Sequence, residues 1–202
     1  MTDRLQPDAE GLSAAAALLR AGSLVAFPTD TVYGVACAAS RADRVDALFE
    51  LKRRPTDRRI PMLVADIGAL PDGWRVDDRA RRLADAFWPG ALTMVLPAVA
   101  GDATQAFRAP DHPVTQALIQ AAGPLLATSA NISDEPDTLD ANDVLIAFAT
   151  QQDDLAAVVD GGQVPGGVAS TVVDLSAEPA RVLRAGPITF AQLASVVEVL
   201  PD

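Results

Sequence analysis

The chain has a single cysteine, a single histidine and a single lysine among its 202 residues. One cysteine excludes an internal disulfide framework and fits a reducing cytoplasm. One histidine beside one cysteine argues against a zinc site built from these ligands. The same two residues do not assemble convincingly into a Ser-His-Asp or Cys-His nucleophilic group.

Positive charge and long apolar runs are also scarce. Sixteen Lys and Arg stand against 27 Asp and Glu, which gives a net charge of −11. Such a chain is not expected to bind nucleic acid over a broad face. No apolar run approaches the length of a membrane span, and the acidic N-terminal residues do not fit a signal peptide. We therefore expect a cytoplasmic, soluble protein that forms one domain over residues 1–202, with its core at about 9–190.

Apolar periodicity, capping residues and glycine or proline breaks alternate between helical and extended patterns. Two pairs of residues resemble capping boxes, Ser40 with Asp43 and Thr189 with Gln192, and each predicts the start of a further helix. We expect an α/β fold with a twisted mixed sheet and flanking helices. The predicted helices cover 9–21, 78–87, 114–122 and 141–150, and the predicted strands 24–27, 62–64, 92–96, 104–108, 125–128, 156–159, 170–175 and 181–184.

The lone lysine, Lys52, lies in a basic cluster with Arg53, Arg54, Arg58 and Arg59. One interpretation is a surface lysine at a helix end, where a cation suits the helix dipole. The other is a compact point charge for a carboxylate or phosphate. As a surface residue, Lys52 is expected to change stability by no more than ~0.5 kcal/mol when it is replaced.

Polar segments follow two predicted strands. Pro28-Thr29-Asp30-Thr31-Val32-Tyr33-Gly34 and Ala127-Thr128-Ser129-Ala130-Asn131-Ile132-Ser133 are rich in hydroxyl and amide groups. In open α/β sheets ligands bind beyond strand ends. Thr29 and Thr31 are expected to point the same way in extended chain. The alternative is a pair of polar turns whose side chains bond to local backbone.

A glycine-rich segment at 161–167 precedes Ser170. Its backbone N–H groups suit phosphate binding, although it has neither a Walker motif nor a GxGxxG fingerprint, and a flexible loop is the alternative. Arg108 and Arg184 each end an apolar strand, and a buried arginine needs an acidic partner or an anionic ligand. His112 is interpreted as a loop residue and not as a catalyst.

In their order over residues 24–188, these segments closely resemble the YrdC-like family of threonylcarbamoyl-adenylate synthases. The resemblance implies a twisted α/β sheet with a concave, positively lined cavity. The matching segments are Phe27–Gly34, Lys52–Pro55, Phe87–Gly90 with Thr93, Arg108–Pro113, Thr128–Ser133, Ser170–Asp174 and Leu183–Gly186.

The resemblance also implies a reaction in which L-threonine, bicarbonate and ATP give threonylcarbamoyl-AMP and pyrophosphate. The product would serve N6-threonylcarbamoyladenosine formation at position 37 of tRNA. A divalent cation, Mg²⁺, is expected to accompany ATP, with no metal ligand assigned to the protein. Downstream tRNA threonylcarbamoyl-transferase proteins are the implied partners, with little direct tRNA binding.

The resemblance also implies roles for individual residues. Lys52 and Arg54 would be catalytic. Thr31, Arg108 and Ser170 would bind threonine. The nucleotide contacts would be Arg54, Thr104, Ser129, Asn131 and Arg184.

Two features depart from the family pattern. Asp134 stands where the family often has glycine, which predicts a left-handed turn that Asp tolerates. The loop at 56–60 is longer than the compact family version, so the roles of Arg58 and Arg59 stay open. Two alternative functions are kept: a double-stranded RNA-binding module without catalysis, and a carbamoyl-transfer domain.

Overall fold

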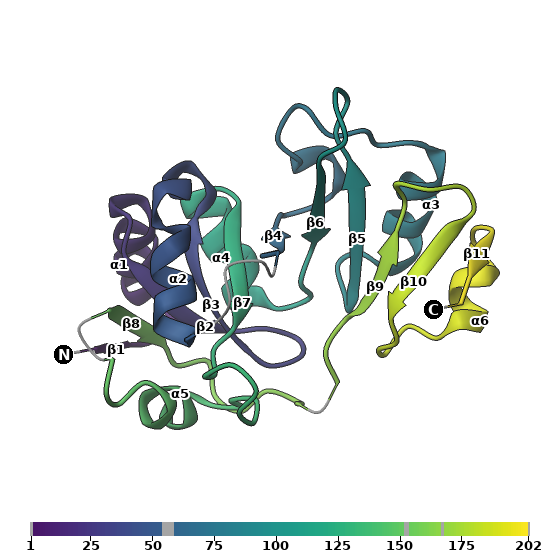
Figure 1. Ribbon diagram of the computed structural model, residues 1–202. Coiled ribbons are helices and arrows are strands. Elements are labelled where there is room, and N and C mark those ends of the chain that lie inside the picture. Colours follow the sequence, from purple (N-terminus) through teal and green to yellow (C-terminus); the bar gives the residue numbers. More distant parts are fainter. Residues whose placement is uncertain (1, 54–58, 152–153, 167, 202) are drawn as a thin grey trace. The chain divides into compact units, whose positions relative to one another are not determined.

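The structure is a computed structural model that describes residues 2–53, 59–151, 154–166 and 168–201 (Figure 1). The chain divides into two compact units. Unit 1 comprises Met1–Ile60 and His112–Gly167, and unit 2 comprises Pro61–Asp111 and Val168–Asp202. No helix in the described ranges combines the length and the apolar character that a membrane span requires.

The described residues of unit 1 form five strands in the order β1-β8-β2-β3-β7. The pairings β1–β8 and β8–β2 are parallel, whereas β2–β3 and β3–β7 are antiparallel. The strands are β1 (Asp3–Leu5), β2 (Leu24–Pro28), β3 (Tyr33–Ala38), β7 (Leu125–Ser129) and β8 (Leu155–Val159), and the helices are α1 (Ala9–Ala21), the 3-10 helix η1 (Ala39–Arg44), α2 (Val45–Lys52), α4 (Pro113–Ala122) and α5 (Ala141–Ala147).

Strands β2 and β3 are buried along their whole length and form the centre of unit 1. Helix α1 packs against α4 and β2 through a face that includes Ala15, Ala16 and Leu19. Asp8 caps the N-terminus of α1, and Gly22, at a φ of 92°, ends it in the left-handed conformation that glycine adopts readily. These local signals explain why α1 begins and ends where the sequence predicts.

In unit 2, residues 61–111 and 168–201 form six strands in the order β4-β6-β5-β9-β10-β11. Parallel pairs (β4–β6, β5–β9, β10–β11) alternate with antiparallel pairs (β6–β5, β9–β10). Leu83 of α3 packs in a core with Met94, Phe107 and Val173. The elements are β4 (Met62–Leu63), the 3-10 helix η2 (Ile67–Ala69), α3 (Asp78–Phe87), β5 (Leu92–Pro97), β6 (Thr104–Arg108), β9 (Thr171–Asp174), β10 (Ala180–Arg184), α6 (Phe190–Ala194) and β11 (Val199–Leu200).

The predicted α/β class with parallel and antiparallel strands is confirmed, as is the Thr189–Gln192 capping box. The Ser40–Asp43 capping box is wrong. Asp43 instead accepts two hydrogen bonds from Arg41, and α2 starts at Val45 without a side-chain cap. The predicted helix 141–150 ends at Ala147, and β1, β3 and β11 were not among the predicted strands.

Candidate functional site

Lys52 is the last residue of α2, and its ammonium group lies inside unit 1 with 2% of the residue exposed. Its Nζ atom donates to the backbone carbonyls of Ser129 (2.5 Å) and Asn131 (2.6 Å) and to Oδ1 of Asn131 (3.0 Å). The backbone carbonyl of Lys52 also accepts from the N–H of Ser133 at 3.0 Å. The interpretation of Lys52 as a surface residue is therefore wrong. The side-chain ammonium and the backbone carbonyl of this lysine both form hydrogen bonds with the 129–133 loop.

The loop after β7 is further ordered by its own side chains. Ser129 donates from Oγ to Oδ1 of Asn131 at 2.7 Å, and Nδ2 of Asn131 donates to the carbonyl of Glu135 at 2.6 Å. Asp134 has a φ of 67°, which confirms the predicted left-handed turn. Lys52, Ser129 and Asn131 thus form one hydrogen-bonded cluster, in which the amide orientation of Asn131 is fixed.

Thr29 and Thr31 lie side by side, with 3.1 Å between their hydroxyl oxygens. The cause is a tight turn and not the predicted extended chain. Thr29 donates to the carbonyl of Val32 at 2.7 Å, and its oxygen accepts from the N–H of Thr31 at 3.1 Å. For Thr29 the local-backbone alternative is therefore correct.

The glycine-rich segment lies against this turn. The phenol of Tyr33 donates to the carbonyl of Gly162 (2.8 Å) and accepts from the N–H of Gly161 (3.2 Å). No role is predicted for this tyrosine from the sequence. The N–H of Gly166 donates to the carbonyl of Thr31 at 2.9 Å. Burial raises the pKa of Tyr33 to about 12, against the smaller opposing effect of the Gly161 hydrogen bond. Gly161, Gly162 and Gly166 are thus held by hydrogen bonds to Tyr33 and Thr31, whereas Gly167 lies outside the described residues.

In unit 2, Ser170 lies between two polar side chains. Its Oγ is 2.8 Å from Oγ1 of Thr93 and 3.2 Å from Nη2 of Arg184. Arg184 is exposed, contrary to the apolar surroundings that the sequence indicated, and it also donates to the carbonyl of Ser170 from Nε (3.1 Å) and Nη2 (2.8 Å). Thr93 belongs to a matching segment of the sequence, but no role was predicted for it.

Arg108 is buried at the end of β6 and donates from Nε to the carbonyl of Gly90 at 3.1 Å. Thr104 lies at the other end of β6, so this strand does not bring the two residues together.

His112 caps α4 through Nδ1, in agreement with its interpretation as a loop residue. Arg54 and Arg58 lie outside the described residues, and Arg59 is exposed.

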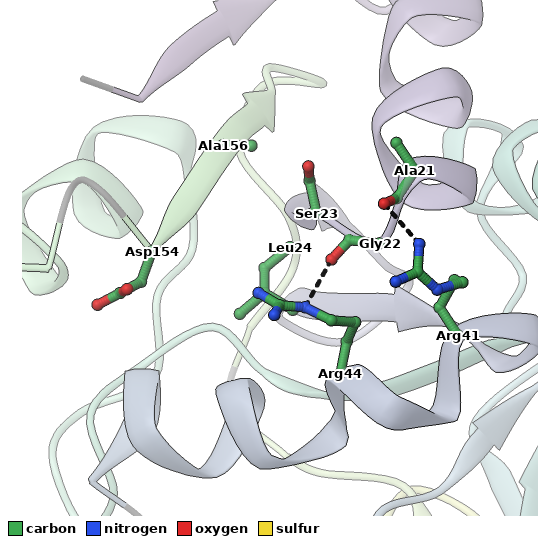
Figure 2. Close-up of a pocket in the computed structure, with 8 residues that line it drawn as sticks. All are labelled: Ala21, Gly22, Ser23, Leu24, Arg41, Arg44, Asp154 and Ala156. Atoms are coloured by element: carbon green, nitrogen blue, oxygen red, sulfur yellow. Dashed lines mark hydrogen bonds between the residues drawn. The ribbon is translucent and has the colours of Figure 1, made fainter.

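A separate recess of about 300 Å³ lies beside the C-terminal end of α1 (Figure 2). Arg41 donates to the carbonyl of Ala21 at 2.6 Å, and Arg44 donates to that of Gly22 at 3.0 Å. Both arginines therefore satisfy carbonyls that a helix leaves unpaired at its end. No residue predicted for the site lines this recess in the described part of the chain.

Metal ligands are not gathered in either unit as far as the structure describes them. Residues 2–53, 59–151, 154–166 and 168–201 contain no group of three His, Cys, Asp or Glu side chains placed to hold a metal ion.

Known proteins match nearly the whole chain. The model of the Sua5/YciO/YrdC family, described as "Telomere recombination", matches residues 17–186. The threonylcarbamoyl-AMP synthase of Bacillus subtilis is 40% identical over 208 residues, which cover 98% of this chain and 59% of that protein. A putative threonylcarbamoyl-AMP synthase of Mycobacterium tuberculosis is 37% identical over 94% of this chain and 90% of its own length.

A solved structure shares the fold. The crystal structure of P. abyssi Sua5 complexed with L-threonine aligns with a TM-score of 0.87 and 32% identity, over 99% of this chain and 62% of that one. The chain therefore spans about three fifths of the B. subtilis and P. abyssi proteins and nine tenths of the mycobacterial one.

Proposed function

Because the chain belongs to the Sua5/YciO/YrdC family, we propose that it is a threonylcarbamoyl-AMP synthase. Its substrates are L-threonine, bicarbonate and ATP, and its products are threonylcarbamoyl-AMP and pyrophosphate. The observation that carries the proposal is the cluster of Lys52, Ser129 and Asn131, found in a chain that is 37–40% identical to proteins with that name.

The reaction joins several anions. The amino group of threonine and bicarbonate condense to a carbamate with loss of water. An oxygen of this carbamate then attacks the α-phosphorus of ATP, and the bond to the β-phosphate breaks to release pyrophosphate. Since the chain as a whole carries a net charge of −11, positive charge has to be concentrated at the site to stabilise the phosphates.

Lys52 and Arg54 are proposed as the catalytic cations. The four oxygen contacts of Lys52 within 3.3 Å support a second task, which is to fix the 129–131 loop so that its hydroxyl and amide are pre-positioned. The binding roles implied by the resemblance are proposed unchanged. Threonine is bound by Thr31, Arg108 and Ser170, and the nucleotide is bound by Arg54, Thr104, Ser129, Asn131 and Arg184.

Mg²⁺ is proposed to arrive on the ATP phosphates. This ion keeps several waters and binds through substrate phosphates with few protein carboxylates. There it would neutralise charge on the leaving pyrophosphate.

The proposed product feeds a later transfer to adenosine 37 of tRNA by separate cytoplasmic proteins. A carbamoyl adenylate is an activated acyl donor, so its consumer must be a transferase that presents an amine nucleophile. The net charge of −11 disfavours the RNA-binding alternative.

Incubation of the chain with ATP, L-threonine, bicarbonate and Mg²⁺ tests the proposal. We expect stoichiometric pyrophosphate and threonylcarbamoyl-AMP, with neither product when threonine or bicarbonate is omitted. Ser129→Ala should raise KM for ATP, whereas Ser195→Ala, which changes an exposed hydroxyl in unit 2, should not. A folded protein that forms no pyrophosphate under these conditions contradicts the proposal.

A further inference from the structure

Thr93 is a buried residue of β5 whose hydroxyl contacts Ser170. The two residues are 77 positions apart in sequence, their hydroxyl oxygens are separated by 2.8 Å, and they are 3% and 5% exposed. Among the described residues, Ser170 is the hydrogen-bonding partner of the Thr93 hydroxyl. The pair is therefore built into the interior of unit 2.

Arg184 donates a second hydrogen bond to the same serine oxygen. Its Nη2 lies 3.2 Å from Oγ of Ser170, and its Nε and Nη2 also reach the carbonyl of that residue. An arginine can only donate. One of the two acceptor positions of the Ser170 hydroxyl is consequently filled by Arg184.

The backbone holds Arg184 in this position. The pairing of β9 with β10 shifts register between Val182 and Arg184, and such irregularities re-aim a side chain. Gly186 then passes so close to Ser170 that a Cβ there would lie 2.7 Å from the carbonyl carbon of Ser170 and 2.4 Å from the N–H nitrogen of Thr171. The hydroxyl of Thr171 fixes the following turn by bonding Ile188. These contacts give Ser170 and Arg184 one defined geometry.

The pair contains two hydroxyl protons but only one hydrogen bond between its members. Within the described residues one proton is thus left without an acceptor, which is unusual for buried groups. If Ser170 donated, the leftover proton would belong to Thr93, inside strand β5. If Thr93 donates, both acceptor positions of Ser170 are filled and the serine proton remains for a ligand.

We propose that Thr93 is a positioning residue that donates to Ser170, so that Ser170 offers its O–H proton to an oxygen of the amino-acid substrate. The inference rests on the proposed function. It assigns a role to Thr93, a residue for which the resemblance to the family implied none. Thr93 acts through Ser170 and selects an acceptor atom over a donor atom at that point of the substrate.

A set of variants tests this with steady-state kinetics. Thr93→Val keeps the shape of the side chain and removes its hydroxyl. We expect KM for L-threonine to rise about tenfold, because a tenfold change corresponds to the loss of one hydrogen bond. KM for ATP should change less than about twofold. Thr93→Ser restores the hydroxyl and should return KM for L-threonine close to the wild-type value. The double variant Thr93→Val/Ser170→Ala should be no worse than Ser170→Ala alone, because Thr93 then has nothing to orient.

Two results would overturn the inference. One is a wild-type KM for L-threonine in Thr93→Val. The other is a double variant whose KM for L-threonine rises by the product of the two single effects. If Thr93→Val does not fold, Thr93→Ala in the same cycle answers the same question. A wild-type chain that neither binds L-threonine nor forms product refutes the proposed function itself, whereas an active wild type with an indifferent Thr93→Val refutes only the role of Thr93.

Discussion

The ammonium group of Lys52 donates to both oxygens of Asn131, at 2.6 Å to the backbone carbonyl and 3.0 Å to the side-chain amide. The only lysine of the chain is therefore buried in unit 1 and is not a mobile side chain on the surface of the protein. A compact ammonium can place three protons on closely spaced oxygens, which a planar guanidinium cannot do in the same space.

Replacing Lys52 should affect both activity and stability. Lys52→Met leaves the part-buried carbonyl of Ser129 and the buried carbonyl of Asn131 without this donor, so we expect a loss of about 1–3 kcal/mol in the free energy of unfolding and loss of synthesis. Lys52→Arg should rescue poorly. Urea unfolding measures the first effect, with Arg82→Ala, an exposed cation of α3, as a control within about 0.5 kcal/mol. Wild-type stability in Lys52→Met would contradict the structural role of this lysine.

Substrates should stabilise the folded chain. A ligand that binds only the native state raises the melting temperature by mass action, so ATP and L-threonine should each do so. L-Serine lacks one methyl group and should bind more weakly by about 1 kcal/mol. Thermal shift and calorimetry measure both effects. An absence of threonine binding with and without ATP would count against the proposed function.

Direct tRNA binding should be weak. The 27 acidic residues outnumber the 16 basic ones, so the approach of a polyanion is opposed and few counterions are released. We expect a Kd weaker than ~10⁻⁵ M at physiological salt. A fluorescence titration that gives tight, salt-sensitive binding by this chain alone would favour the RNA-binding alternative.

Alkaline pH should destabilise unit 1 through Tyr33. Because burial raises the pKa of Tyr33 from 10.0 to about 12, the stability that depends on its neutral form is complete below pH 10. It declines as the pH rises toward 12, since the unfolded state ionises first. Tyr33 is the only tyrosine, so phenolate absorbance reports this group alone. Tyr33→Phe should remove the corresponding pH dependence, and a phenolate that forms near pH 10 in folded protein would refute the assignment.

The sequence predicts elements well where the signals are local. Helix α1 has its N-cap Asp8 and its C-terminal Gly22 next to it in sequence, and the predicted bounds agree with the structure. The Ser40–Asp43 box fails even though it is local, because Arg41 competes for the carboxylate and lowers the pKa of Asp43 through its hydrogen bonds. A motif of two residues does not show that a third residue between them forms stronger hydrogen bonds with one of the pair.

The arrangement of the site is not predictable to the same degree. Lys52 and Asn131 are 79 positions apart, and the fold of unit 1 brings the end of α2 to the loop that follows β7. The sequence indicated that Lys52 could end a helix but contained no information on which loop its ammonium group would reach. The same holds for Thr93 and Ser170, whose contact depends on the parallel pairing of β5 with β9.

The single tyrosine and cysteine of the chain lie in a different unit from its two tryptophans. Tyr33 and Cys37 lie in unit 1, and both tryptophans, Trp74 and Trp88, lie in unit 2. Cys37 is fully buried and its pKa is raised to about 11 by burial, so a thiol reagent reaches it only after unit 1 opens. The wild-type chain thus carries an intrinsic chemical probe for one unit and an intrinsic fluorescent probe for the other. Denaturation curves from the two probes would coincide if the units unfold in one cooperative step and separate if they do not.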